Sequence, residues 1–211
     1  MKFGFKFFLF AVAFLFSGAA FSAAQLGTDY SMLATPQPAS TKKIEVMEFF
    51  FYECPHCYHL HNELMGWEKS MPGDVEMVFV PTIFRDSTEP LARAYYALEA
   101  LGQSKQLEDP IYQAIHVKNM DLHDLNSIST FVASQGVDKA KFIAAYNSFT
   151  VNSEITRAKQ MIRSYGINGT PTLIVDGRYV ITGLQPAATL RALDEVIAMV
   201  RSERKAHSAK H

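Results

Sequence analysis

The two cysteines of the chain lie three residues apart, between an apolar run and a helical pattern. The apolar run from Ile44 to Phe51 ends just before Cys54, and from Cys57 to about Lys69 apolar residues recur at helical spacing. No other cysteine occurs in the 211 residues. A strand that delivers a C-x-x-C motif to the first turn of a helix is an arrangement for thiol–disulfide chemistry. This stretch therefore constrains both the fold and the function.

The hydrophobic pattern predicts a β–α–β unit around the motif, followed by helices and a second set of strands. Strands over 44–51 and 75–80 flank the first helix, which implies parallel pairing and a right-handed crossover. Four helices are expected after residue 80, over 90–101, 104–118 with an interruption at Pro110, 124–135 and 138–149. A fifth helix, capped by Asn152 or Ser153, ends at Tyr165. Strands over 173–176 and 179–182, joined by an Asp176-Gly177 turn, and a helix from Pro186 complete the chain. This order predicts an α/β protein with a mixed sheet, a thioredoxin fold with an inserted helical domain.

The pattern divides the chain behind its N-terminal segment into four parts. Residues 25–84 form an extended lead-in and the first part of the thioredoxin domain, and residues 85–150 form the inserted helical domain. Residues 151–205 form the connecting helix and the second part of the thioredoxin domain. Residues 206–211 are expected to be a flexible tail, and the basic segment from Arg201 onward is expected to be solvated and frayed.

Residues 1–24 have the pattern of a secretory signal peptide. Lys2 and Lys6 precede an apolar core over 7–16, and small residues follow it. The core is shorter than the roughly 20 residues that a membrane-spanning helix needs. We predict cleavage near residues 22–24, with an uncleaved membrane anchor as the alternative. The mature chain is therefore expected to be soluble and exported.

Charge and cysteine content narrow the class of protein further. The formal net charge is −1, from 20 basic and 21 acidic residues, so no basic field favours nucleic acid as a partner. In an oxidising compartment a lone cysteine pair normally forms a disulfide. A bridge that closes so short a loop stabilises the fold little, because the gain grows with loop length. The pair is therefore interpreted as functional rather than structural.

The four residues of the motif have distinct expected roles. Cys54 is expected at the N-cap or in the first turn, where unpaired N–H groups and the helix dipole favour a reactive thiolate. Cys57, one turn inside, is the expected shielded resolving thiol. Pro55 suits an early helical position because it has no N–H to leave unpaired. His56 is expected to donate a hydrogen bond or a positive charge toward the Cys54 sulfur, which stabilises the reduced pair and favours an oxidant.

A metal site is the competing interpretation of the same stretch. Its potential ligands are Cys54, His56, Cys57, His59 and His61. Structural zinc sites usually draw two ligands from a distant segment, and no second pair stands out, since His116 and His123 are isolated. No metal is therefore predicted, and His59 and His61 are interpreted as exposed helix residues. Haem attachment is excluded because Tyr58, not histidine, follows the second cysteine.

Two further residues are candidates for the site. Pro171 precedes a strand, as a proline that cannot donate to a sheet ladder should. In a thioredoxin fold it is a cis-proline facing the cysteines, with the backbone of Thr170 free to pair with a substrate; an ordinary trans proline is the alternative. Glu48 lies on an apolar face of the first strand. If it is buried beneath the cysteines, its raised pKa suits proton exchange with Cys57; the alternative is a carboxylate that reaches solvent or a local partner.

Three segments together resemble one known family. They are Glu48-Phe49-Phe50, Cys54-Pro55-His56-Cys57-Tyr58 and Thr170-Pro171-Thr172, and they are similar to the DsbA family of periplasmic thiol:disulfide interchange proteins. The resemblance covers nearly the whole mature chain. It implies a periplasmic monomer that donates its disulfide to newly exported proteins through a mixed disulfide at Cys54. A DsbB-type membrane quinone reductase would reoxidise it, and no cofactor beyond the cysteine pair is implied.

The chain departs from its relatives around Glu48. Several relatives carry an acid seven residues after the first cysteine, where this chain has His61, and a lysine in the next strand, which residues 75–80 lack. Glu48 is therefore expected to lack the charged neighbours known in those relatives. Many relatives have valine where this chain has Thr170. This difference is expected to alter the affinity of the protein for clients or for DsbB. The remaining functional alternatives are an exported isomerase or reductase on the same fold and, in a different class, a Cys/His metal-binding module.

Overall fold

A computed structural model describes residues 24–39 and 42–209 of the chain. The sheet has five strands in the order β1-β5-β4-β2-β3. Their bounds are β1 Ser31–Met32, β2 Ile44–Phe50, β3 Val75–Pro81, β4 Thr172–Val175 and β5 Tyr179–Thr182. Strands β2 and β3 are parallel, whereas β4 pairs antiparallel with both β2 and β5, and β1 antiparallel with β5. The sheet is therefore mixed, as predicted.

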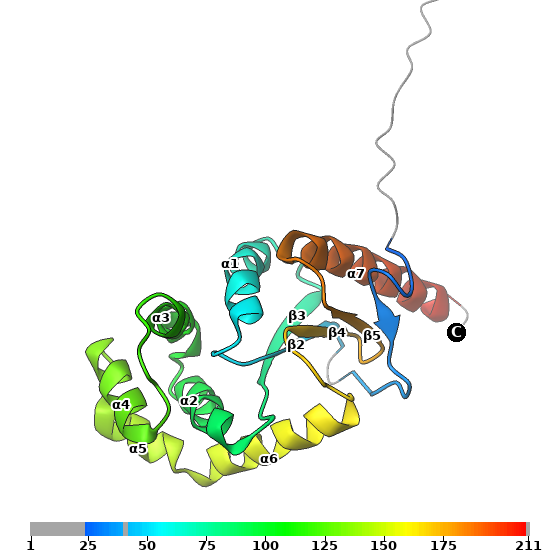
Figure 1. Cartoon of the computed structure of the whole chain (residues 1–211). Helices are drawn as coiled ribbons and strands as arrows, with labels where there is room; N and C mark the ends of the chain where they lie inside the picture. Colours follow the sequence, from blue (N-terminus) through cyan, green and yellow to red (C-terminus); the bar gives the residue numbers. More distant parts are fainter. Residues whose placement is uncertain (1–23, 40–41, 210–211) are drawn as a thin grey trace, which may run out of the picture.

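Helices cover both faces of the sheet and form a separate block beside it (Figure 1). Helices α1 (Pro55–Lys69) and α7 (Pro186–Ser208) lie on one face, and α6 (Phe149–Ser164) lies on the other. The block follows β3 and consists of α2 (Glu89–Ala100), α3 (Ser104–His116), α4 (Leu125–Ser134) and α5 (Lys139–Tyr146). A short 3-10 turn, Asp86–Thr88, leads into α2. This is the predicted thioredoxin fold with a helical insertion.

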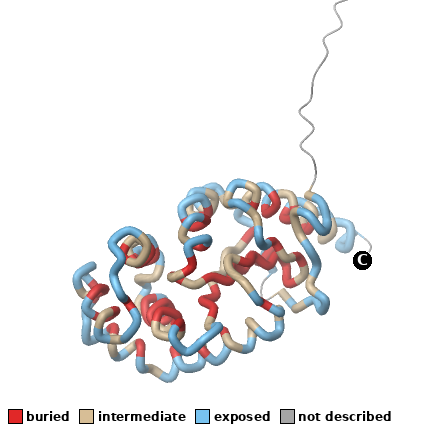
Figure 2. Tube along the Cα trace, in the orientation of Figure 1, coloured by how far each residue is buried: buried red, intermediate tan, exposed pale blue. Residues whose placement is uncertain are grey.

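Strand β2 is the centre of the molecule because all seven of its residues are buried. Its side chains alternate between two hydrophobic clusters. Ile44 and Val46 pack in the cluster that includes α1 and α7 residues, whereas Met47 and Phe49 pack in the one that includes α6 and the helical block. Figure 2 shows the buried residues concentrated in the sheet and in the inner faces of the helices. Each face of the strand thus has its own core.

The lead-in segment forms an edge strand rather than a purely extended approach. Ser31 and Met32 pair with β5, and the Gln37 N–H donates to the Gly177 carbonyl at 2.8 Å. Gly177 has a φ of 63°, and a Cβ there would come within 2.1 Å of the Gln37 carbonyl oxygen. Asp176 also has a positive φ, 54°, so the predicted Asp176-Gly177 hairpin turn is confirmed.

Two predicted helix boundaries are wrong. Helix α6 begins at Phe149, because the Ser148 hydroxyl accepts a hydrogen bond from the Val151 N–H at 3.2 Å and caps it four residues earlier than expected. Helix α3 is not interrupted at Pro110 but runs through it. The carbonyl that loses its helical partner there belongs to Gln106, which is exposed, so solvent can satisfy it.

The expected fraying from Arg201 onward is also wrong, because α7 continues to Ser208. Arg201 donates two hydrogen bonds to the Asp74 carboxylate, at 2.6 and 2.9 Å. Arg204 donates to the Lys42 and Lys43 carbonyls, at 2.8 and 3.0 Å, and to Asp176. These contacts tie the last turns of the helix to the edge of the sheet. Residues 1–23, which hold nearly all of the predicted signal peptide, lie outside the described part of the chain.

We expect Arg204→Ala to lower the free energy of unfolding by about 2 kcal/mol, because it removes a partner of the largely buried Asp176 carboxylate. Chemical denaturation of the purified protein measures this value. Arg157→Ala is the matched control, because Arg157 pairs with Glu154 of its own helix, α6, at the surface. This substitution should lower the free energy of unfolding by about 0.5 kcal/mol or less. Equal losses for the two variants would contradict the structural role of Arg204.

Candidate active site

Cys54 is the N-cap residue of α1, as predicted. Its backbone is extended, with φ −78° and ψ 117°, and Pro55 takes the first helical position, where no N–H is needed. The Cys54 N–H donates to the Phe51 carbonyl at 3.0 Å, which closes the turn between β2 and the helix. The strand therefore delivers the thiol directly to the positive end of the helix dipole.

The loop that contains Thr170 and Pro171 is distant from the motif in sequence but contacts Cys54 in the structure. The Thr170–Pro171 peptide bond is cis, which confirms that prediction. The Cys54 thiol donates to the Thr170 carbonyl, with 3.5 Å between Sγ and oxygen. Both cysteines are free thiols; Cys54 is 6% exposed, whereas Cys57 is fully buried. The two thiols are close together, and only Cys54 reaches the surface.

The surroundings of the two thiols drive their pKa values apart. The pKa of Cys54 is lowered to about 5, chiefly by a hydrogen bond from the Cys57 thiol, with smaller help from the Thr170 side chain and from the backbone N–H groups of Cys57 and His56. The Cys54 side chain accepts no capping hydrogen bond of normal geometry, so those N–H groups act mainly as dipoles. Burial raises the pKa of the Cys57 thiol far above its usual range. The pair is thus a reactive thiolate beside a protonated thiol.

The His56 side chain is exposed beside the motif. It lines a cavity of about 400 Å³ together with His59, Glu63, Pro171 and Gln185. Its backbone N–H, rather than its imidazole, is among the groups that lower the pKa of Cys54. The role expected for the His56 imidazole stays a prediction.

Glu48 is buried, 4% exposed, at the centre of β2. It lies in register with Phe79 of β3 and Leu173 of β4, on the strand face that looks toward α1. Burial raises its pKa well above the usual range, and the nearby charges of Glu108 and Cys54 raise it further. Glu48 is therefore buried, as the proton-exchange interpretation requires, and its surroundings favour the protonated form of the carboxyl.

A charged group other than those known in the relatives acts on Glu48, because the charge of Glu108 of α3 contributes to its raised pKa. Glu108 is 5% exposed, and burial together with the charges of Glu68 and Asp109 raises its pKa to about 7. Sequence reasoning missed this residue. The available signal was a glutamate in helical register with the apolar positions Ile111 and Tyr112, the same kind of signal that singled out Glu48.

His61 is buried, 4% exposed, which overturns the interpretation of it as an exposed helix residue. Its ring packs on Tyr112 with centroids 4.8 Å apart, and its Nδ1 lies 3.8 Å from the Glu108 Oε1. Burial lowers its pKa. The reason for the error is that α3 covers this side of α1, which no local pattern in α1 reveals. His59, by contrast, is exposed as expected.

His116 and His123, the two candidate metal ligands outside the motif helix, have protein partners. His116 hydrogen-bonds through Nε2 to the Tyr52 carbonyl at 2.7 Å and stacks on the Tyr58 ring, which fastens the end of α3 to the loop before Cys54. His123 is exposed beside Asp121. Within residues 24–39 and 42–209, no group of three or more Cys, His, Asp and Glu side chains is arranged to hold a metal ion. No helix in the same part of the chain is long and apolar enough to cross a membrane.

Fold and site together define a class: thioredoxin-fold proteins with a helical insertion and a low-pKa cysteine at a helix N-terminus. The sequence pattern of the DSBA-like thioredoxin domain matches residues 45–193. The chain belongs to this family, whose members act through their own cysteine pair without a cofactor. It is a thiol:disulfide oxidoreductase of the DsbA type.

Individual relatives agree with this assignment along most of the chain. The thiol:disulfide interchange protein DsbA of Burkholderia cepacia is 36% identical over 184 residues, 84% of this chain and 86% of the relative. DsbA of Pseudomonas aeruginosa is 33% identical over 183 residues, 85% and 87% of the two chains. The crystal structure of the oxidoreductase DsbA from Xylella fastidiosa superposes with a TM-score of 0.81 at 32% identity, covering 85% of this chain and 99% of that one.

We expect the Cys54 thiol to titrate at about 5, as measured by thiolate absorbance against pH in the protein and in Cys54→Ser. A cysteine in an unfolded chain titrates near 8.5, so the lowered pKa stabilises the folded reduced protein above that value. The stabilisation is lost as the pH falls through about 5. The reduced protein should therefore unfold at a higher temperature than the oxidised protein at neutral pH, and the difference should shrink on acidification. A titration near 8.5 would contradict the site geometry.

Proposed function

We propose that the protein introduces disulfides into newly exported proteins in the periplasm by donating the Cys54–Cys57 disulfide. The observation on which the proposal rests is the contrast between an accessible Cys54 of low pKa and a buried, protonated Cys57. A stabilised thiolate favours the reduced pair, so the disulfide is easily reduced by a client. Membership of the DsbA family and the predicted signal peptide support the proposed location in the periplasm.

The exchange proceeds in two steps that balance thiols and electrons. A client thiolate attacks the Cys54 sulfur; the Cys54–Cys57 bond breaks, a mixed disulfide forms and Cys57 leaves as a thiolate that takes up a proton. A second client thiolate then attacks the client sulfur of the mixed disulfide, and Cys54 leaves as the stabilised thiolate. The client loses two electrons and gains a disulfide, while the cysteine pair gains the two electrons.

Glu48 is the proposed source of the proton for Cys57. Its carboxyl is buried in surroundings that favour the protonated form. Burial is the main cause of the raised pKa of Cys57, and a negative charge on Glu48 adds to it, so the two groups are close enough to interact. A fully buried Cys57 thiolate is unfavourable, so a proton donor inside the protein lowers the barrier to its departure. After exchange Glu48 recovers its proton from solvent.

Thr170 and Pro171 form the proposed client-binding edge. The Thr170 carbonyl lies 3.5 Å from the Cys54 sulfur, and Thr170 is half-buried just before the start of β4. An extended client segment that pairs with the Thr170 backbone would place its cysteine against Cys54. The neighbouring cavity, with His56 and Pro171 in its lining, offers room for client side chains.

The complete cycle needs a partner that removes the two electrons. Family membership implies client proteins and a DsbB partner in general. We propose specifically that clients are unfolded chains bearing free thiols, that a DsbB-type membrane quinone reductase reoxidises the pair, and that the protein works as a monomer. Oxidation rather than isomerisation or reduction is favoured because the low pKa of Cys54 stabilises the reduced form.

We expect Cys57→Ser to accumulate mixed disulfides with client proteins in the periplasm. The Cys54 thiolate attacks a client disulfide and releases one client thiolate, and the mixed disulfide that forms persists because no Cys57 thiol is present to displace the client. Cys54→Ser should form none and should have no oxidase activity. Non-reducing gel electrophoresis of alkylated extracts detects the species. The absence of adducts in Cys57→Ser cells that contain the folded variant would contradict the proposed mechanism.

We expect the redox equilibrium with glutathione to identify the pair as an oxidant. Thioredoxin has a cysteine pKa near 7 and a potential of about −270 mV. A Cys54 pKa lower by about two units, at about 30 mV per unit, predicts a potential about 60 mV or more above that value. A potential at or below thioredoxin's would support the reductase alternative instead.

A further inference from the structure

We propose that His116 of the helical insertion is a positioning residue for Cys54, which it fixes in place through a hydrogen bond to the turn that leads into the motif. The proposal deepens the oxidant role proposed above, but it concerns the cysteine pair itself and not the clients. His116 is the last residue of α3 and lies far beyond the motif in sequence. Its imidazole contacts the chain both before and after the two cysteines.

The segment that leads into Cys54 is a tight turn. The Cys54 N–H donates to the Phe51 carbonyl at 3.0 Å, so Tyr52 and Glu53 are the two central residues of this turn. The hydrogen bond that closes a β-turn does not involve the peptide between its two central residues, and the orientation of that peptide distinguishes one turn type from another. The position of Cys54 therefore depends on a peptide unit that the turn itself does not restrain.

His116 restrains this central peptide. Its Nε2 lies 2.7 Å from the Tyr52 carbonyl oxygen, and because a carbonyl only accepts, Nε2 carries the proton and is the donor. A flipped central peptide would require a positive φ at Glu53. Among the non-glycine residues of the described chain only Asn119 and Asp176 have a positive φ, so Glu53 is in the unflipped conformation. The hydrogen bond keeps the Tyr52 carbonyl in that orientation.

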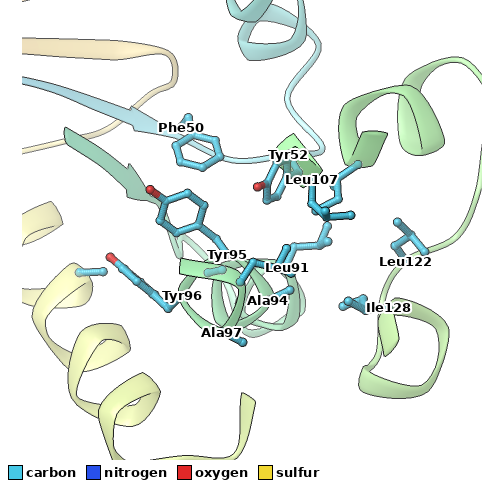
Figure 3. Packing of buried hydrophobic residues seen from close by; sticks show 14 of the residues in the cluster. Phe50, Tyr52, Leu91, Ala94, Tyr95, Tyr96, Ala97, Leu107, Leu122 and Ile128 are labelled. Atoms are coloured by element: carbon cyan, nitrogen blue, oxygen red, sulfur yellow. The ribbon is translucent and has the colours of Figure 1, made fainter. Parts of the chain in front are cut away.

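The Tyr52 side chain is anchored in the interior by the same helix. It is 1% exposed, and its ring packs against the rings of Phe50 and Tyr112 with centroids 5.3 and 5.1 Å away. In Figure 3 the ring extends from the loop before α1 into the hydrophobic cluster to which α2 and α3 contribute. Tyr112 lies one turn before His116 on α3, so this helix holds both the ring and the carbonyl of Tyr52.

The His116 ring also holds the other flank of the motif. The Tyr58 ring, directly after Cys57, stacks on it with centroids 4.8 Å apart and planes inclined by 11°. The Tyr58 N–H donates to the Cys54 carbonyl at 3.1 Å, which is the first hydrogen bond of α1. Helices often fix this turn by an apolar contact between the residue before the N-cap and the fourth residue after it. Here the residue before the N-cap is Glu53, and the stack between Tyr58 and His116 takes the place of that contact while directing Nε2 to its acceptor.

The geometry of this first turn determines how well Cys54 carries a negative charge. A hydrogen bond from the Cys57 thiol and the backbone N–H groups of Cys57 and His56 are among the causes of its low pKa. The effect of such groups depends on their distance from the sulfur and on their direction. A turn that is free to change conformation moves the sulfur relative to them. Loss of the His116 hydrogen bond should therefore raise the pKa of Cys54 and make the disulfide harder to reduce.

The test separates the hydrogen bond from the stacking. His116→Gln keeps an N–H donor at the same distance from the backbone, whereas His116→Phe keeps a ring against Tyr58 but has no donor. Thiolate absorbance against pH measures the pKa of Cys54, and equilibrium with glutathione measures the reduction potential. We expect His116→Phe to raise the pKa of Cys54 by about one unit and to lower the equilibrium constant for reduction about tenfold, or by about 30 mV. His116→Gln should stay close to the native values.

His123→Phe is the matched control. It makes the same substitution in the loop that follows α3, at an exposed histidine beside Asp121, and should leave the pKa and the potential unchanged. A shift in His123→Phe equal to that in His116→Phe would overturn the proposal. So would an equal shift in His116→Gln, because the hydrogen bond would then not be what positions Cys54.

Thermal unfolding of each variant separates positioning from stability. A merely structural role for His116 predicts that the variants lose stability without a change in the pKa of Cys54 or in the potential, and this result would overturn the proposal. If His116→Phe does not fold, His116→Asn takes its place. Its amide nitrogen is closer to the backbone than Nε2 of His116, so it cannot reach the Tyr52 carbonyl, and it should shift both values as His116→Phe does.

The outcomes also distinguish this proposal from the proposed function. An oxidising native protein whose pKa and potential are unchanged in the folded His116 variants overturns the positioning role and leaves the function intact. A native potential at or below that of thioredoxin, with a still lower potential in His116→Phe, contradicts the oxidant role and supports the positioning of Cys54 by His116.

Discussion

The contact between the N-terminus of α1 and the cis-proline loop is the interaction on which the rest of the site depends. It brings the Cys54 sulfur to 3.5 Å from the Thr170 carbonyl, across 116 residues of sequence. Strand β2, which is completely buried, leads into the turn before α1 and so fixes where the helix starts. The inserted block packs around this centre, and its α3 reaches back to the loop before Cys54 through His116. The helical insertion is thus part of the site rather than an appendage.

The unequal properties of the two cysteines follow from geometry that a C-x-x-C spacing allows but does not require. Cys54 lies at the helix end, where N–H dipoles and the Cys57 thiol stabilise negative charge. Cys57 lies one turn inside, where burial opposes it. The same low dielectric that protects Cys57 creates the need for a nearby proton donor. A buried acid beneath the pair is a direct consequence of shielding the second thiol.

Sequence reasoning worked where the pattern was local and failed where partners came from distant elements. The strands, the motif helix and the hairpin turn could be predicted because periodicity and turn residues are properties of short stretches. Glu48 could be singled out because an acid interrupts an apolar strand face. Glu108 was missed although it lies in helical register with Ile111 and Tyr112. The burial of His61 could not be predicted, because it depends on how α3 packs against α1, and no pattern within α1 records that contact.

The sequence by itself determined the chemistry: two cysteines at this spacing, after a strand and before a helix, in a chain without other thiols. It also determined the family, through the motif and the proline that faces it. Only the tertiary structure decided which charges act on the site. Glu108 and His61 are buried because the helical insertion packs against α1, and burial is the main cause of the pKa shifts of Glu48, Glu108 and His61. Electrostatic coupling depends on distance and burial, and both are properties of the folded chain.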